Sequence, residues 1–419
     1  MQNTLNRDIL DREIYWYDNK KTIETTPYIK EGINQWKHLL HNNGAVKGNL
    51  VTISMLTVDI HHISAILACA EMGLKIVILD SPATKESLPY TKLALHGPSD
   101  FYIHFNHTGY GAYKGLHGEM LKRYGGKPID CLDVGDMPIG DLDTGEVYPD
   151  DPLLMSSTSG TTKPSRPVYF SHKEVMTISH RNINIFKFDS ESVVVHSRNL
   201  HHASAMLTSL IPALMVSNHH ITFPVSHDNS IMTDKRQLEL YKLIHDQEVT
   251  HIMIPNKHTL MDFLETYNVP FKRTLNINMC GFALDQSFVE LAERYNVYFQ
   301  SHYGTIDTAI PLLINFVNKD SVVKENSLGV LPDDFYQLNG TEVMCELWDE
   351  PRYIEDKLKH KDGEFFIKPR KETSGRYLIE LLRDCPEEID LDLFFQDTKL
   401  NMEQLRGHIQ EVKKRHDNS

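Results

Sequence analysis

The sequence predicts an α/β protein in which parallel-rich sheets are flanked by helices. The clearest support is the segment 47–80, where the β-rich run KGNLVTISM precedes a helical run rich in Ala, Ile and Leu. A second apolar strand, KIVILD, follows, and Gly73 stands where the helix can end. A strand–helix–strand unit of this kind is typical of a largely parallel sheet covered by helices.

The same alternation recurs further along the chain. Leu240, Leu243 and Ile244 lie at helical spacing, and strand-like runs follow. With 419 residues, the chain exceeds the ~250–300 at which single cores stop growing, so we expect at least two subdomains. The repeating segments are RQLELYKLIHDQEV, THIMIP and KHTLMDFLETY in residues 236–267, and INMCGFAL, DQSFVELAERY and VYFQSHYG in residues 277–304.

Composition and charge narrow the class of protein. With 41% hydrophobic and 24% charged residues the chain is an ordinary globular protein. Its formal net charge of -14 argues against general attraction to nucleic acid or to anionic membranes, so we expect neither partner. The five cysteines form no C-x-x-C pair, and no leader pattern or ~20-residue apolar run is present. We therefore expect a cytoplasmic protein without a disulfide framework or zinc module.

One cluster of small and hydroxyl-bearing residues suggests an anion site. Residues 156–168 read SSTSGTTKPSRPV, and backbone N–H groups in a tight turn together with Ser and Thr hydroxyls can bind phosphate. The segment is not a G-x-x-x-x-G-K-[ST] loop, because Gly160 is its only glycine. By itself the pattern fits a phosphate-binding loop or a solvated surface loop.

The longer segment TSGTTKPSRPVYFSH, residues 158–172, resembles a known phosphate loop without a gap. That loop, T-S-G-T-T-G-x-P-K-G-V-x-x-T-H, belongs to the AMP-forming adenylating enzymes: acyl-CoA synthetases, peptide-synthetase adenylation domains and luciferases. Lys163, Ser165 and Pro167 depart from it, and Arg166 stands at its lysine. The matching positions are Thr158, Ser159, Gly160, Thr161, Thr162, Val168 and His172.

Five further segments resemble motifs of the same family and follow its order. The resemblance therefore implies an adenylating-enzyme core over residues 1–370, with a subdomain connection in the Gly-, Asp- and Pro-rich stretch 133–152. Residues 371–419 would form a short, mainly helical extension, so that the family's small C-terminal domain is mostly missing. The segments are NLHHASAML with His202, EVTHIMIPN, MCGFAL, YGTID, and IEDKLKHKDGEFFIKPR with Asp356 and Arg370.

The resemblance implies a reaction and a set of site residues. In this family a carboxylate attacks the α-phosphorus of ATP to give an acyl-adenylate and pyrophosphate, and a thiol or other acceptor then takes the acyl group. ATP, Mg2+, a small carboxylic acid and, as one acceptor, coenzyme A are the implied ligands. The catalytic residues would be Arg166, His202 and Asp307, with Asp307 also holding Mg2+ through carboxylate oxygen. The nucleotide-binding residues would be Thr158, Ser159, Gly160, Thr161, Thr162 and Lys163 for the phosphates, Gly281, Phe282, Ala283, Tyr303, Gly304 and Thr305 around adenine, and Asp356 and Arg370 at the ribose.

Other interpretations of these residues stay open. Tyr303 can simply pack, Asp307 can cap a helix, and Asp356 can belong to a solvated face. The three His-His pairs, His61–His62, His201–His202 and His219–His220, suggest a metal site, although adjacent histidines on one element point in different directions.

Two departures from the family raise alternatives to a complete ligase. Ile306 replaces a threonine that contacts the α-phosphate, and isoleucine cannot donate a hydrogen bond. No counterpart of the family's lid lysine is found after Arg370. Three alternatives follow. The chain is a ligase with a minimal lid or with a lid supplied by a partner protein, or it is a nucleotide- or acyl-adenylate-binding module that has lost adenylation. The third alternative is an adenylating core whose acceptor is not coenzyme A. Candidates for the acid pocket are Met206, Leu207, Phe282 and Thr308, which favour an apolar or mixed acid.

Overall fold

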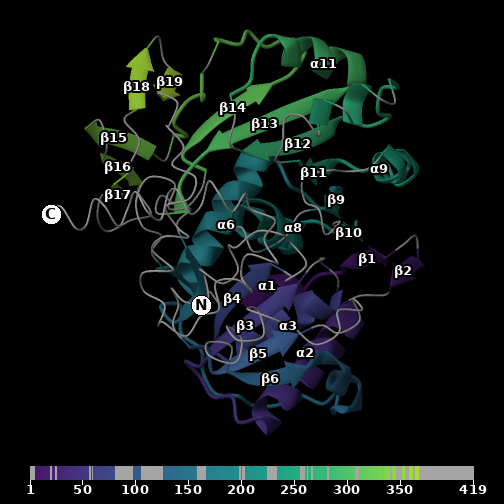
Figure 1. Cartoon of the computed structure of the whole chain (residues 1–419), viewed down its shortest axis with the longest axis vertical. Helices are drawn as coiled ribbons and strands as arrows, with labels where there is room; N and C mark the ends of the chain where they lie inside the picture. The colour runs from purple at the N-terminus through teal and green to yellow at the C-terminus, as the bar shows by residue number, and fades with distance from the viewer. Residues whose placement is uncertain are drawn as a thin grey trace, which may run out of the picture.

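A computed structural model of the chain contains two large β-sheets with helices packed on them (Figure 1). It describes residues 5–18, 21–23, 26–55, 58, 60–80, 98–104, 126–157, 167–197, 200, 203–223, 234–254, 260–261, 263–265, 268–280, 283–306, 311–325, 327–333, 335–339, 342–345, 352–353, 358–361 and 364–367.

The first sheet has six strands in the order β6-β5-β3-β4-β7-β8. All neighbouring pairs are parallel except β7 and β8, which are antiparallel. The strand–helix–strand unit expected in residues 47–80 is present as β3, α3 (Ile60–Glu71) and β4. The strands are β3 (Leu50–Met55), β4 (Lys75–Asp80), β5 (Phe101–His104), β6 (Lys127–Asp130), β7 (Pro152–Ser157) and β8 (Pro167–Ser171).

The second sheet has eight strands in the order β14-β13-β12-β11-β9-β10-β1-β2. Six consecutive strands, from β13 to β1, are parallel, and only the outermost pairs are antiparallel. The predicted α/β class with parallel-rich sheets is therefore confirmed. The strands are β1 (Tyr15–Asp18), β2 (Lys21–Ile23), β9 (Val193–His196), β10 (His219–Thr222), β11 (His251–Met253), β12 (Leu275–Cys280), β13 (Val297–Tyr303) and β14 (Leu313–Val317).

The helix α6 (His172–Phe186) lies between the two sheets in Figure 1. It begins with a capping box, because Ser171 N–H donates to Glu174 Oε2 at 2.9 Å and Glu174 N–H donates to Ser171 Oγ at 3.2 Å. Its apolar side joins a core cluster that also includes Phe170 of the first sheet and Met253 of the second. The same cluster therefore packs both sheets together.

The remaining helices cover the sheets, and two small sheets follow β14. The helices are α1 (Leu5–Leu10), α2 (Thr26–Asn42), α7 (Ala203–Ala205), α8 (Ile211–Val216), α9 (Asp234–Asp246) and α11 (Ser287–Tyr295), with the 3-10 helix η2 (Cys131–Asp136) and the π-helix η3 (Met206–Leu210). The small sheets contain β15 (Phe335–Asn339), β16 (Glu342–Cys345) and β17 (Arg352–Tyr353), and β18 (Leu358–Lys361) and β19 (Glu364–Ile367).

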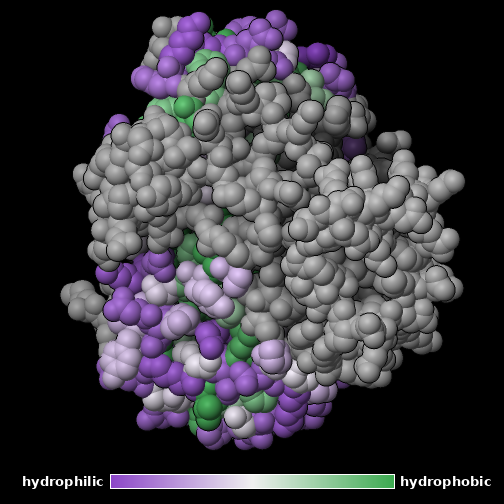
Figure 2. Space-filling view, turned by 60° about the vertical axis from the view of Figure 1, so that its left-hand side comes forward, coloured by the Kyte–Doolittle hydropathy of each residue, from purple (hydrophilic) through white to green (hydrophobic). Residues whose placement is uncertain are grey.

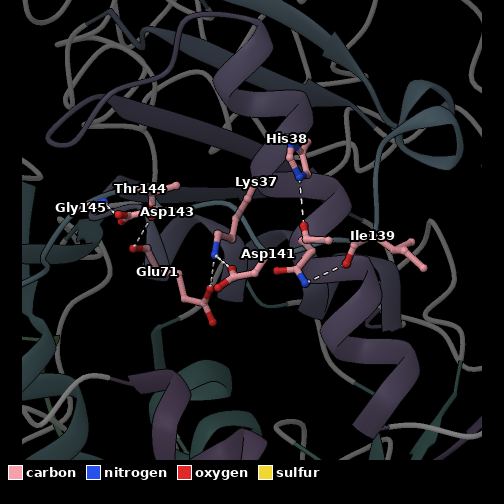
Figure 3. Close-up of polar contacts among 10 residues, drawn as sticks. Lys37, His38, Glu71, Ile139, Asp141, Asp143, Thr144 and Gly145 are labelled. Carbon is pink, nitrogen blue, oxygen red and sulfur yellow. Dashed lines mark hydrogen bonds and ion pairs between the residues drawn. The ribbon is translucent and has the colours of Figure 1, made fainter.

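The stretch 133–152 joins η2 to β7, and its residues after η2 run along α2 (Figure 3). Its anchor is Lys37, which is 4% exposed and whose Nζ lies 3.0 Å from Glu71 Oε2 and 2.8 Å from Asp141 Oδ1. His38 also bonds the carbonyl of Gly140 at 3.0 Å. Burial lowers the pKa of Lys37, but the bonds to Asp141 and Glu71 outweigh it, so the pKa is raised overall. The lysine therefore stays charged and fixes this stretch.

Replacing Lys37 by methionine is expected to lower the free energy of unfolding by about 1.5–3 kcal/mol. Methionine preserves the apolar stem but removes two charge-assisted hydrogen bonds. Urea denaturation measures the effect, and Lys30→Met, at an exposed position of the same helix, is the control. Equal unfolding free energies for the two variants would contradict this role of Lys37.

The described surface on the face shown in Figure 2 is mostly hydrophilic, with hydrophobic residues in small groups. Over the ranges that the structure describes, no helix combines the length and the apolar character needed to cross a membrane.

Candidate functional site

The parallel strands of the eight-stranded sheet bring the predicted adenine-binding residues to one edge. Ala283 follows the end of β12, and Tyr303, Gly304 and Thr305 stand at the end of β13. β12 and β13 pair in parallel, so their carboxyl ends lie side by side. In open α/β sheets, ligands bind in the crevice outside the carboxyl ends of the strands. All four residues are partly exposed, as a ligand site at this edge requires.

Tyr303 and Ile306 have apolar neighbours as well. Tyr303 packs against a small cluster that contains Leu312 and Leu313, and its carbonyl accepts from Leu312 N–H at 2.7 Å. Ile306 packs against the main core cluster. These contacts fix the path of the chain beyond β13 without assigning a ligand.

Most of the predicted site lies outside the residues that the structure describes, so its roles stay predictions. The residues in question are Thr158, Ser159, Gly160, Thr161, Thr162, Lys163, Arg166, His202, Gly281, Phe282, Asp307, Asp356 and Arg370, together with Thr308 and the extension 371–419. The predicted pocket residues Met206 and Leu207 are described, and both are buried in the main core cluster.

The two ends of the predicted phosphate loop are held next to each other. β7 ends at Ser157 and β8 begins at Pro167, and these two residues are paired in the antiparallel ladder. Because α6 follows β8 directly, the hairpin is attached to a helix that contacts both sheets. The sequence segment 158–166 therefore starts and finishes at one fixed place in the fold.

His172, the last matching position of the loop motif, lies at the far end of β8 from Pro167. It is fully buried as the first residue of α6, and its backbone N–H donates to the carbonyl of Asp151 at 3.1 Å. Burial lowers the pKa of its imidazole to about 4, against the opposing effect of the Asp151 carboxylate. Its neutral ring is a core group in this structure.

A π-helix lies directly after the segment that contains His202. In η3 the carbonyl of Leu207 accepts from Asn182 Nδ2 at 2.7 Å, and that of Thr208 accepts from Asn278 Nδ2 at 3.3 Å. Side-chain amides from α6 and β12 thus bond to carbonyls of the wider helical turn. Single π-turns inside α-helices often occur at functional sites. The sequence signal for Asn278 is a polar residue within the apolar strand INMC.

Two buried histidines stack on a tryptophan across β9, β10 and β1. The ring centroids of Trp16, His196 and His220 lie 5.3–5.4 Å apart in each pair, and His196 Nε2 is 3.1 Å from His220 Nδ1. Burial lowers the pKa of His220 to about 3 and that of His196 well below its usual value. At neutral pH both rings are therefore uncharged.

The neighbouring His219 faces a different set of side chains. It stacks on Tyr15, and Tyr17 Oη lies 3.2 Å from its Nδ1, whereas His220 packs on Trp16. The two adjacent histidines therefore point in different directions. Throughout the described ranges, no group of three or more His, Cys, Asp or Glu side chains is arranged to hold a metal ion.

Comparison with known proteins identifies the fold. No protein-family model and no curated protein sequence matches the chain. Among solved structures, O-succinylbenzoate coenzyme A synthetase (MenE) from Bacillus subtilis, in complex with ATP and magnesium, aligns with a TM-score of 0.71 and 15% identity over 88% of this chain and 80% of its own. The McyG A-PCP structure with phenylalanyl-adenylate gives a TM-score of 0.70 and 14% identity over 88% and 76%.

A third structure is covered almost completely by the alignment. The N-terminal subdomain of NpsA from Klebsiella oxytoca, in complex with 3-hydroxybenzoyl-AMSN, has a TM-score of 0.67 and 12% identity over 87% of this chain and 98% of its own. The chain therefore has the fold of the AMP-forming adenylating enzymes, as its motifs imply.

Proposed function

We propose that the protein activates a carboxylic acid with ATP, forming an acyl-adenylate and pyrophosphate, and passes the acyl group to a thiol or other acceptor. The observation that carries this proposal is the order of the motif residues on the shared fold: Ser157 and Pro167 bracket the hydroxyl-rich segment, and Ala283 and Tyr303 stand at the strand edge. Similar proteins have been solved with ATP, magnesium or an acyl-adenylate bound.

The hydroxyl, cationic and carboxylate side chains of the motif segments suit the groups of Mg2+-ATP that they would bind. Hydroxyls of the 158–162 segment and the cations of Lys163 and Arg166 would hold the phosphates, while Asp356 would accept from the ribose hydroxyls. Mg2+, which prefers oxygen ligands, would be held by Asp307 and would neutralise phosphate charge. We place this activity in the cytoplasm, with coenzyme A or a carrier protein as acceptor.

The second candidate is a nucleotide- or acyl-adenylate-binding module without adenylation activity. Ile306, partly exposed just beyond β13, stands where the family has the threonine that contacts the α-phosphate. An aliphatic side chain there supplies no donor to the reacting phosphate. This substitution would affect the chemical step more than nucleotide binding.

Carboxylate-dependent exchange of pyrophosphate into ATP, measured across a panel of acids, tests the proposal. We expect exchange with one class of acid and its loss when Mg2+ is chelated. Asp356→Asn should weaken ATP binding about tenfold or more, because it removes a charged acceptor of ribose hydroxyls. Asp333→Asn, at an exposed position, is the control.

The outcomes separate the two candidates. Binding of Mg2+-ATP without exchange for any acid would favour the binding module. Failure to bind Mg2+-ATP would rule out both.

A further inference from the structure

Two buried carboxamides lie side by side beneath the candidate site. Asn278 of β12 and Gln300 of β13 are directly paired in the parallel ladder and are 4% and 0% exposed. Their strand neighbours Ile277 and Phe299 belong to the core cluster on the opposite face of the sheet. The two amides therefore point toward α6 and η3, which their hydrogen bonds confirm.

The orientation of both amides is set by their acceptors. Asn278 Nδ2 donates to the carbonyl of Thr208 at 3.3 Å, and Gln300 Nε2 donates to the carbonyl of Phe186 at 3.3 Å. A carbonyl oxygen can only accept, so the amide nitrogens must face these groups. The amide oxygens consequently point elsewhere.

Those two amide oxygens are unpaired among the residues that the structure describes. Asn278 Oδ1 and Gln300 Oε1 are buried, and within the described part of the chain nothing donates to either atom. Leaving a buried acceptor unsatisfied costs about 1–3 kcal/mol, and native structures pair the large majority of such groups. Two unsatisfied oxygens at paired positions therefore mark a place where a ligand can supply the donor that the described residues do not.

The location of the pair connects it to the acid-binding end of the proposed site. Asn278 and Cys280 lie on the same side of β12, two residues or about 6.7 Å apart, and Cys280 is partly exposed at the carboxyl edge. The π-helix η3 packs opposite, through Thr208. An acid whose carboxyl group lies at the edge can place a group several bonds away beside the two oxygens.

We propose that Asn278 and Gln300 accept hydrogen bonds from the substrate, which is therefore a carboxylic acid carrying a hydroxyl or amino group remote from its carboxyl group. This inference rests on the proposed function. Two neutral acceptor oxygens favour such a group and disfavour a second carboxylate or a plain hydrocarbon end, because neither of these supplies a hydrogen-bond donor to them. The sequence led us to expect an acid that is either wholly apolar or carries both apolar and polar groups. The two amide oxygens favour the second kind.

Matched acids test the inference: 3-hydroxybenzoate against benzoate, and 3-(4-hydroxyphenyl)propionate against 3-phenylpropionate. Their pyrophosphate exchange is measured together with calorimetric binding of the corresponding non-hydrolysable acyl-adenylate analogues. In at least one pair, the acid with the donor should be preferred by about tenfold or more. In Asn278→Leu, and in Gln300→Met as a second variant, this ratio should fall toward one.

Asn182→Leu is the matched control. It removes the bond to the carbonyl of Leu207 on the other side of η3 but leaves Asn278 in place, so it should retain the preference. Binding that discriminates without exchange in any acid would overturn the proposed function and support this inference. Equal binding within both pairs, no binding of any analogue, or an unchanged ratio in both folded amide variants would overturn the inference, and an ordered water would then explain the two oxygens.

Discussion

Replacing Gly329 by alanine is expected to lower the free energy of unfolding by about 4 kcal/mol or more. Gly329 has a φ of +96°, and an added Cβ would lie 1.8 Å from the carbonyl oxygen of Ile314. That neighbour is backbone and cannot rotate away. The carbonyl of Gly329 accepts from Phe365 N–H at 2.8 Å, and Val330 pairs with Ile314. Relieving the clash therefore separates Gly329 and Val330 from β14, beyond the ~1–3 kcal/mol cost of the positive φ itself.

A second glycine separates the cost of the close backbone approach from the cost of the positive φ. Gly145 has a similar φ of +87°, but an added Cβ would meet nothing within 4 Å. Gly145→Ala should therefore lose only about 1–3 kcal/mol. Urea denaturation of both variants measures the difference, and equal losses would show that the close approach to Ile314 is not what requires glycine at position 329.

Acidification is expected to unfold the protein well above the pH at which its buried histidines titrate in the folded state. Burial lowers the pKa of four imidazoles: about 4 for His172 and His251, about 3 for His220, and well below the usual value for His196. In the unfolded chain each has a pKa near 6.5. Between these values the unfolded state binds more protons, so stability is complete above about pH 6.5 and falls as the pH decreases.

The size of the effect follows from linkage. Each such histidine contributes a slope of up to about 1.4 kcal/mol per pH unit, so four together can exhaust a typical stability of ~5–15 kcal/mol before pH 4. Urea denaturation between pH 7.5 and 5 measures this slope. His220→Phe, which keeps a ring against Trp16, should reduce it by about 1.4 kcal/mol per pH unit, and replacement of the exposed His61 by glutamine is the control. If the unfolding free energy of His220→Phe depended on pH as steeply as that of the original protein, His220 would not be one of the groups that cause the loss of stability in acid.

Local patterns made much of the fold predictable. The apolar periodicity of residues 47–80 predicts β3, α3 and β4 because a strand and a helix each impose their own spacing on the side chains they bury. The pairing of β1 with β10 was not predicted, since it joins Tyr15 to His219, which are far apart in the sequence. A contact at that separation leaves no periodic signal in either segment.

The sequence by itself determined the class of fold. Through its motif resemblance it also determined the proposed nucleotide site, because short hydroxyl-rich and glycine-containing segments can be recognised from local sequence alone. Only the tertiary structure decided which side chains lie together beneath the strand edge where the acid is proposed to bind. Asn278 and Gln300 are 22 residues apart, and the parallel register of β12 and β13 makes them neighbours. Packing against α6 and η3 then uses their amide nitrogens and leaves their oxygens for a ligand.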